Sequence, residues 1–145
     1  MRSRPVFSQR AIMIEFYPQI HSVHIWAITM SGLCMAIRGL GLICGMHWPC
    51  SVLAWSIGLA IDGTVLTVAA MLFSILPAAL FANHWLWVKL IFVVIYFAAG
   101  YWLLLSEQTR MRQVLLLATA MAAYALAYGV ARAHDPSGWL TIWGI

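Results

Sequence analysis

The histidines and one lysine of this chain are the residues best suited to bind a ligand or move a proton. His21, His24, His84, Lys89 and His134 lie near the borders of long apolar segments. Paired imidazoles from facing helices of a bundle are a common way to ligate haem iron. A histidine together with a lysine suits the acidic groups of a porphyrin or the head of a quinone. A third alternative is a solvated position at a membrane interface with no ligand.

The candidate ligand-binding residues are therefore His24, Lys89, His134 and His84. Haem b is the cofactor that this pattern permits, with iron held by His24 and by His134 or His84. The pattern predicts no other metal site firmly. His21 is expected to be an interfacial residue.

Arg38 and Asp62 are the two charged residues expected deep inside the apolar segments. Counted from the turn between their helices, both lie at roughly 17 Å, at a rise of 1.5 Å per residue. An isolated charge in hydrocarbon is costly, so each needs a partner. The spacing predicts a structural Arg38–Asp62 ion pair, with a proton or ligand site as the functional alternative.

The composition explains why these polar groups need positioning by helices. The chain has 145 residues, of which 64% are hydrophobic and 8% are charged, with a mean hydropathy of +0.92. Soluble domains carry about 25% charged residues, so the chain is expected to be an integral membrane protein. A membrane span needs about 20 apolar residues, which leaves room for four spans in a single domain over residues 1–145.

The expected fold is an all-α antiparallel bundle of four transmembrane helices with both termini on one side. A basic extension (1–16) precedes the spans, in which Met13 is an alternative start, and an interfacial tail (133–145) with two tryptophans follows them. Proline before the first span and proline after the second mark helix boundaries. The spans are expected at 20–45, 52–76, 85–105 and 114–132.

One face of the first span carries polar residues at helical spacing. His24, Ile28, Ser31, Met35 and Arg38 follow helical spacing and share that face. His24 and Arg38 are thus both expected to point into the bundle, about 21 Å apart along the helix axis.

Three cysteines allow several interpretations. Cys34 is expected to be a small buried residue of the first span. Cys44 and Cys50 flank the first loop. Three interpretations of these two residues are open. They are free thiols, or they form a disulfide if the loop faces an oxidising compartment, or they form an incomplete soft-metal site together with His47.

Short motifs in the right order along the chain resemble those of the SirB family, small four-span bacterial inner-membrane proteins described as up-regulators of invasion gene expression. The segments that carry the resemblance are MIEFYPQIHSVHI (13–25), Ser31-Gly32, Arg38-Gly39, IDGTVL (61–66), WVKL (87–90), Tyr96, Gly100 and VARAHDPSGW (130–139). The chain departs from the family pattern at two positions: Gly58 and Leu59 stand where a histidine often precedes the aspartate, and Asp135 replaces a second histidine.

A looser resemblance is to HemJ-type protoporphyrinogen oxidases. His24, Arg38 and Lys89 fall in the same order as a histidine, an arginine and a lysine of that group. This resemblance implies haem or porphyrin chemistry. No phosphate-binding loop, nucleophile elbow or HExxH motif is present in the sequence, which leaves the question of enzymatic activity open.

Three functions follow from these observations. The first is a SirB-like binding or accessory subunit with a polar site at the cytoplasmic end of the bundle. The second is a haem-binding or porphyrin-oxidising redox protein, and the third is a structural subunit of a larger membrane complex. The expected partners are the lipid bilayer and other membrane subunits or further copies of the chain, not nucleic acid. The SirB resemblance implies a bacterial inner-membrane location, and arginines near the termini favour cytoplasmic termini.

Overall fold

The computed structural model describes residues 11–12, 14–75, 84–105 and 107–144, and this part of the chain folds into helices without strands. The elements are α2 (Tyr17–Ile43), η1 (Trp48–Cys50), α3 (Val52–Ile75), α4 (Trp85–Leu105), α5 (Arg110–Ala133) and α6 (Trp139–Ile142). The predicted all-α bundle of four long helices is confirmed. The bounds of α4 coincide with the expected third span.

Local sequence explains where the helices begin and end. Pro18 lies in the first turn of α2, where its missing N–H costs no hydrogen bond. After α2 the chain turns through Gly45 at φ +81°, a backbone conformation that glycine adopts without steric cost. Thr109 has extended backbone before α5, and His134 closes α5 in the left-handed conformation. Helix α5 thus begins at Arg110, four residues before the expected apolar span.

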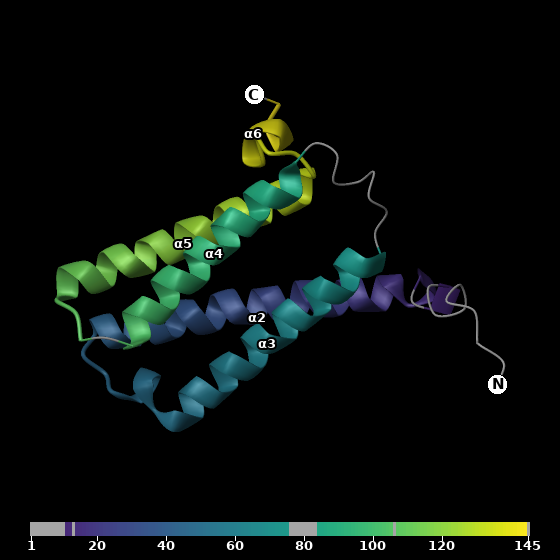
Figure 1. Cartoon of the computed structure of the whole chain (residues 1–145). Helices are drawn as coiled ribbons and strands as arrows, with labels where there is room; N and C mark the ends of the chain where they lie inside the picture. The colour runs from purple at the N-terminus through teal and green to yellow at the C-terminus, as the bar shows by residue number, and fades with distance from the viewer. Residues whose placement is uncertain (1–10, 13, 76–83, 106, 145) are drawn as a thin grey trace, which may run out of the picture.

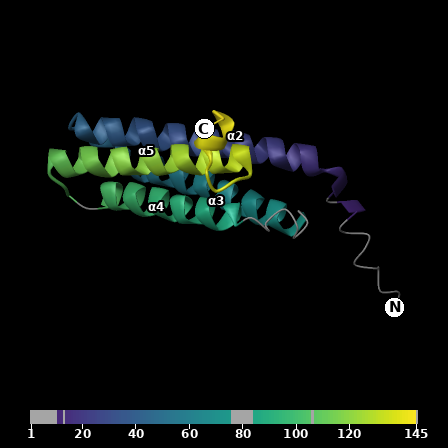
Figure 2. The ribbon, with the colours of Figure 1, turned by 90° about the horizontal axis from the view of Figure 1, so that it is seen from above.

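The four helices form two antiparallel hairpins, α2–α3 and α4–α5 (Figure 1). The strongest packing is within each hairpin, and α2 joins the two by packing mainly against α5. Seen from above, the helices run alongside one another (Figure 2). We call the end where α2 and α4 begin and α3 and α5 finish the histidine end. The opposite end, with the connections after α2 and after α4, is the loop end.

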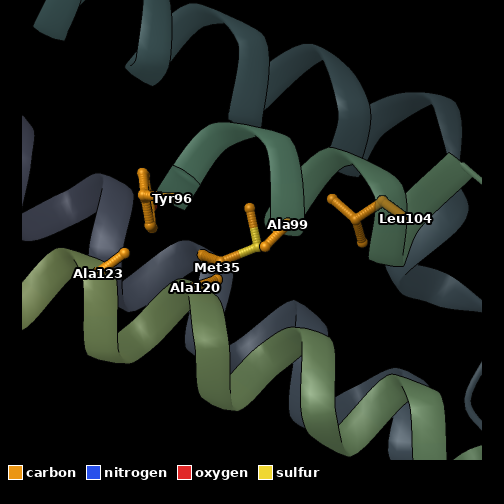
Figure 3. Packing of buried hydrophobic residues seen from close by; sticks show 6 residues of the cluster. All are labelled: Met35, Tyr96, Ala99, Leu104, Ala120 and Ala123. Atoms are coloured by element: carbon orange, nitrogen blue, oxygen red, sulfur yellow. The ribbon is translucent and has the colours of Figure 1, made fainter. Parts of the chain in front are cut away.

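The core between the hairpins depends on small residues that let helices approach closely. Ala120 of α5 is fully inaccessible to solvent, and Met35 of α2 packs against the helix α4 glycine Gly100. Small residues at interfaces are how membrane helices gain packing energy. The central cluster consists of Met35, Tyr96, Ala99, Leu104, Ala120 and Ala123 (Figure 3).

The four long helices are apolar and long enough to cross a membrane. Helix α3 is the least covered of them: its buried residues follow one narrow stripe, whereas Leu53, Ile57, Leu66 and Phe73 are exposed. Apolar side chains on such a surface suit contact with lipid tails. Four such helices in one chain are what a multi-pass membrane protein requires.

Gly32 provides a test of the close helix approach. A methyl group at Gly32 would lie 2.7 Å from the Tyr124 ring, whereas one at Gly63 on α3 would meet nothing within 4 Å. We expect Gly32→Ala to lower the free energy of unfolding in detergent by about 1–3 kcal/mol. Gly63→Ala should leave it unchanged or raise it by up to about 1 kcal/mol. Equal effects of the two changes would contradict this packing.

Candidate functional site

Asp62 is the centre of a hydrogen-bonded network in the interior of the bundle. Its carboxylate accepts a hydrogen bond from the hydroxyl of Ser31 at 2.6 Å and another from the hydroxyl of Tyr101 at 2.8 Å. The Ser31 hydroxyl also lies 2.9 Å from that of Tyr96. Ser31, Asp62 and Tyr96 are buried. Three helices, α2, α3 and α4, thus meet through side-chain hydroxyls at one carboxylate.

Helical spacing brings these residues together. Ala54, Gly58 and Asp62 are buried at intervals of four residues, so they form one stripe of α3 that faces the bundle. Tyr96 and Tyr101 come from α4, five residues apart, and reach the two sides of the network. Hydrocarbon provides no hydrogen-bond partners, so each buried polar group must find one within the protein. The network meets this requirement for the carboxylate.

Arg38 is buried nearer to the loop end, seven residues after Ser31 on α2, and has different partners. Its Nε and Nη2 atoms donate hydrogen bonds to the carbonyl oxygen of Pro49, at 3.1 and 2.9 Å. Its guanidinium carbon lies 5.1 Å from the centroid of the Trp55 ring, a cation–π geometry. Gly58 leaves room for the guanidinium, because a methyl group there would collide with Nη1.

This arrangement differs from the predicted direct Arg38–Asp62 ion pair. The hydrogen bonds of Arg38 go to Pro49, and those of Asp62 come from Ser31 and Tyr101. The reason is depth: Arg38 lies opposite Gly58, whereas Asp62 lies one turn further along α3 at the level of Ser31. Trp55 and Tyr101, stacked with ring centroids 5.8 Å apart, lie between the two charged residues and link them indirectly.

His24 is the buried histidine of the structure. Its side chain is 7% exposed, and Nδ1 has no hydrogen-bond partner within the described part of the chain. A buried imidazole nitrogen without a partner loses its hydration without compensation. Lys89, half-buried on α4, and His21 lie near enough to interact with His24 electrostatically. His24 and Lys89 thus lie at the same end of the bundle.

The other two predicted ligand residues lie at the same end but at the surface. His84 precedes α4 and His134 ends α5; both are exposed and both have positive φ. The His134 ring packs edge-on against Trp85, with centroids 5.0 Å apart. Of the five histidines, all within the described residues, His24 alone is buried. A second axial ligand for haem would have to come from one of the exposed histidines.

In the part of the chain that the structure describes, the cysteines form neither the disulfide nor the metal-binding group that the sequence allowed. Cys34, Cys44 and Cys50 are all free thiols. His47 is exposed, and among the described residues no group of three histidine, cysteine or acidic side chains is arranged to hold a metal ion.

The turn after α5 is fixed by side-chain hydrogen bonds. Asp135 accepts one from the backbone N–H of Ser137 at 2.8 Å and another from the Thr141 hydroxyl at 3.3 Å. These bonds lower the pKa of the Asp135 carboxyl, which lies outside the spans. The indole of Trp139 then packs on Gly129 and donates to the Ala125 carbonyl oxygen at 2.8 Å. The motif anchors α6 at the histidine end.

Sequence reasoning did not identify Tyr101, Trp55 or the Pro49 carbonyl oxygen as parts of the polar core. Tyr101 and Trp55 each lie a few residues from a helix end, where aromatic residues of membrane helices often face the interface. The available signal was the stripe of Ala54, Gly58 and Asp62, which shows which face of α3 is buried. Ser31 was expected on the inward face of the first span, but not as a hydrogen-bond donor to Asp62.

Residues 17–136 match the family described as "Invasion gene expression up-regulator, SirB". The chain belongs to the SirB family. Comparisons with curated proteins and with solved structures found no match. The matched region of this SirB protein includes α2–α5, and therefore both the Asp62 network and the His24 end.

Gly58 and Asp135 both have a structural role. Gly58 is the residue whose missing side chain admits the Arg38 guanidinium. Asp135 is the acceptor that orders the turn before α6. In this SirB protein both positions therefore support local structure.

A pair of serine substitutions tests the Asp62 network. Ser31→Ala removes a donor to a buried carboxylate, so we expect the free energy of unfolding in detergent to fall by about 1.5–3 kcal/mol. Ser56 is the matched control, because it is exposed and its hydroxyl bonds within its own helix to the Val52 carbonyl oxygen. Ser56→Ala should change stability by no more than about 0.5 kcal/mol. A neutral Ser31→Ala would contradict the network.

Proposed function

We propose that this SirB-family protein is a membrane-embedded binding or accessory subunit whose ligand site lies at the histidine end, with His24 and Lys89 as its polar contacts. The observation that carries the proposal is the buried Nδ1 of His24, which has no hydrogen-bond partner among the described residues. Buried polar groups without a partner are uncommon, and an unplaced ligand is one of the explanations for them.

The chemistry of the two residues defines the class of ligand. A neutral imidazole accepts or donates one hydrogen bond at Nδ1, and the Lys89 ammonium attracts an acidic or carbonyl oxygen. Toward the membrane interior both groups are followed by apolar residues, Ile25–Ile28 on α2 and Leu90–Ile95 on α4. The site therefore suits a lipid-soluble molecule with an oxygen-bearing head, such as a quinone or a porphyrin carboxylate.

We further propose a bacterial inner-membrane location with the histidine end in the cytoplasm. Arg132 is exposed in the last turn of α5 at this end, and the sequence before α2 adds arginines. Arg110 and Arg112 at the loop end oppose this bias. Positive residues favour the cytoplasmic side of a membrane protein. Fusion of a reporter to each end tests the orientation.

The ligand itself is best sought in the purified protein. The full chain is purified in mild detergent, its bound small molecules are extracted with organic solvent and identified by mass spectrometry, and an absorption spectrum is recorded. His24→Phe fills the same space without a polar atom and should lower the bound molecule by about tenfold, as expected for the loss of roughly 1.4 kcal/mol. The control His21→Phe, at an exposed position, should retain it.

The alternatives give different results in the same experiment. A Soret band lost in His24→Phe would favour the haem-binding alternative. A preparation with no bound molecule but with stoichiometric membrane partners would contradict the binding site and favour a structural subunit. Equal loss from His24→Phe and His21→Phe would also contradict the assignment of His24.

Lys89 can be tested through its charge. Lys89→Met should weaken binding of the identified molecule to the reconstituted protein about tenfold, whereas Lys89→Arg should weaken it less, because the positive charge remains. Binding is measured by titration into vesicles. If Lys89→Met binds as tightly as the unchanged protein, the lysine does not contact the ligand.

A further inference from the structure

The Asp62 network has a second property besides satisfying a buried carboxylate: it is a continuous chain of exchangeable hydrogens. The oxygens of Tyr96, Ser31 and Asp62 follow one another at 2.9 and 2.6 Å, and Tyr101 joins the other carboxylate oxygen at 2.8 Å. Every member carries or accepts an O–H proton. The network lies apart from the His24 end, seven residues further along α2.

No direct counter-ion accompanies the carboxylate in the described part of the chain. Its own hydrogen-bond partners are neutral hydroxyls, and the Arg38 guanidinium is directed at the Pro49 carbonyl oxygen. The titratable and charged groups around Asp62 and its hydrogen-bond partners are Cys34 and Arg38 from α2, Tyr96 and Tyr101 from α4, and Tyr124 from α5. An ionisable residue buried in a membrane is either paired with an opposite charge or functional. Among the described residues, no cationic side chain is hydrogen-bonded to Asp62.

The hydrogen bonds around Asp62 accommodate both of its protonation states by reversing direction. The contact between Ser31 and Tyr96 can have either atom as its donor. With an ionised Asp62, Tyr96 donates to Ser31 and Ser31 donates to Asp62. With a protonated Asp62, the carboxyl donates to Ser31 and Ser31 donates to Tyr96. The heavy atoms keep their places while the direction of the chain reverses.

We propose that Asp62 is a reversible proton-binding residue in the membrane interior, loaded and unloaded through the hydroxyls of Ser31, Tyr96 and Tyr101. When a proton arrives at the Tyr101 oxygen, Tyr101 passes its own hydrogen to the carboxylate oxygen that it contacts. On the inner side the same transfer runs from Tyr96 to Ser31 and from Ser31 to the carboxylate. Each hydroxyl ends with one hydrogen, and Asp62 gains one. Tyr101, half-exposed and stacked on Trp55 toward the loop end, is the outer end of the chain.

The scarcity of acidic residues makes this proposal testable by infrared spectroscopy. The chain contains four acidic side chains, Glu15, Asp62, Glu107 and Asp135. The combined variant Glu15→Gln, Glu107→Gln, Asp135→Asn therefore leaves Asp62 as its one side-chain carboxyl. This full-length variant is reconstituted into phospholipid vesicles. Isotope-labelled aspartate distinguishes the Asp62 band from the C-terminal carboxyl.

The expected result is a carbonyl band of a protonated carboxyl that appears on acidification, disappears on return to neutral pH, and shifts in heavy water. The band should be lost in Asp62→Asn; if that variant fails to fold, the isotope shift in the combined variant still identifies the residue. A carboxyl that never titrates while the protein stays folded would overturn the proposal. So would a band that sodium ions remove at constant pH, because a cation would then occupy the site.

The relay has its own readout. Tyr96→Phe and Tyr101→Phe should slow the exchange of the Asp62 proton for deuterium and shift the band. The control Tyr128→Phe, which removes a hydroxyl from a tyrosine that packs against Trp139 instead, should do neither. Exchange that is equally fast in all three variants would overturn the role of the hydroxyl chain.

Discussion

A charged or polar group inside hydrocarbon has no water to bind, so the protein itself must supply every hydrogen-bond partner. The carboxylate of Asp62 illustrates the consequence. Ser31 and Tyr101 reach it from two neighbouring helices, and Tyr96 extends the network. Helices α3 and α4 have little direct packing against each other, so the Tyr101–Asp62 hydrogen bond is an important link between them. The network therefore adds a polar link between the two hairpins to the packing of α2 against α5.

The same constraint explains the buried arginine. Arg38 meets a backbone carbonyl and an aromatic face instead of a carboxylate. Pro49 presents that carbonyl from the turn between α2 and α3, so the guanidinium fixes the turn to the helix that precedes it. Gly58 makes the contact sterically feasible. The cation of Arg38 thus stabilises the loop end of the bundle, and the carboxylate or carboxylic acid of Asp62 stabilises the interior.

The fold was accessible from sequence because it follows from composition and span length, which the bilayer constrains strongly. The gathering of His24 and Lys89 was accessible for the same reason, since alternating spans bring these helix ends together. The hydrogen-bond partner of Arg38 was not predicted correctly from the sequence. The prediction took a point near residue 49 as the middle of the turn, whereas α2 ends at Ile43 and α3 begins at Val52. Arg38 is five residues from its helix end, and it therefore lies level with Gly58, six residues into α3, and not with Asp62, ten residues into α3. Tyr101 could not be assigned to Asp62 because the side-chain contacts between α3 and α4 depend on how the two hairpins pack.

A double-mutant cycle between Tyr101→Phe and Asp62→Leu tests the link between the hairpins most directly, with the free energy of unfolding in detergent as the measured quantity. If the hydrogen bond joins α3 to α4, the two changes together should cost less than the sum of the single changes, with a coupling energy of about 0.5–3 kcal/mol. Additivity within about 0.3–0.5 kcal/mol would mean that the two side chains do not interact, and would contradict the network at the centre of this structure.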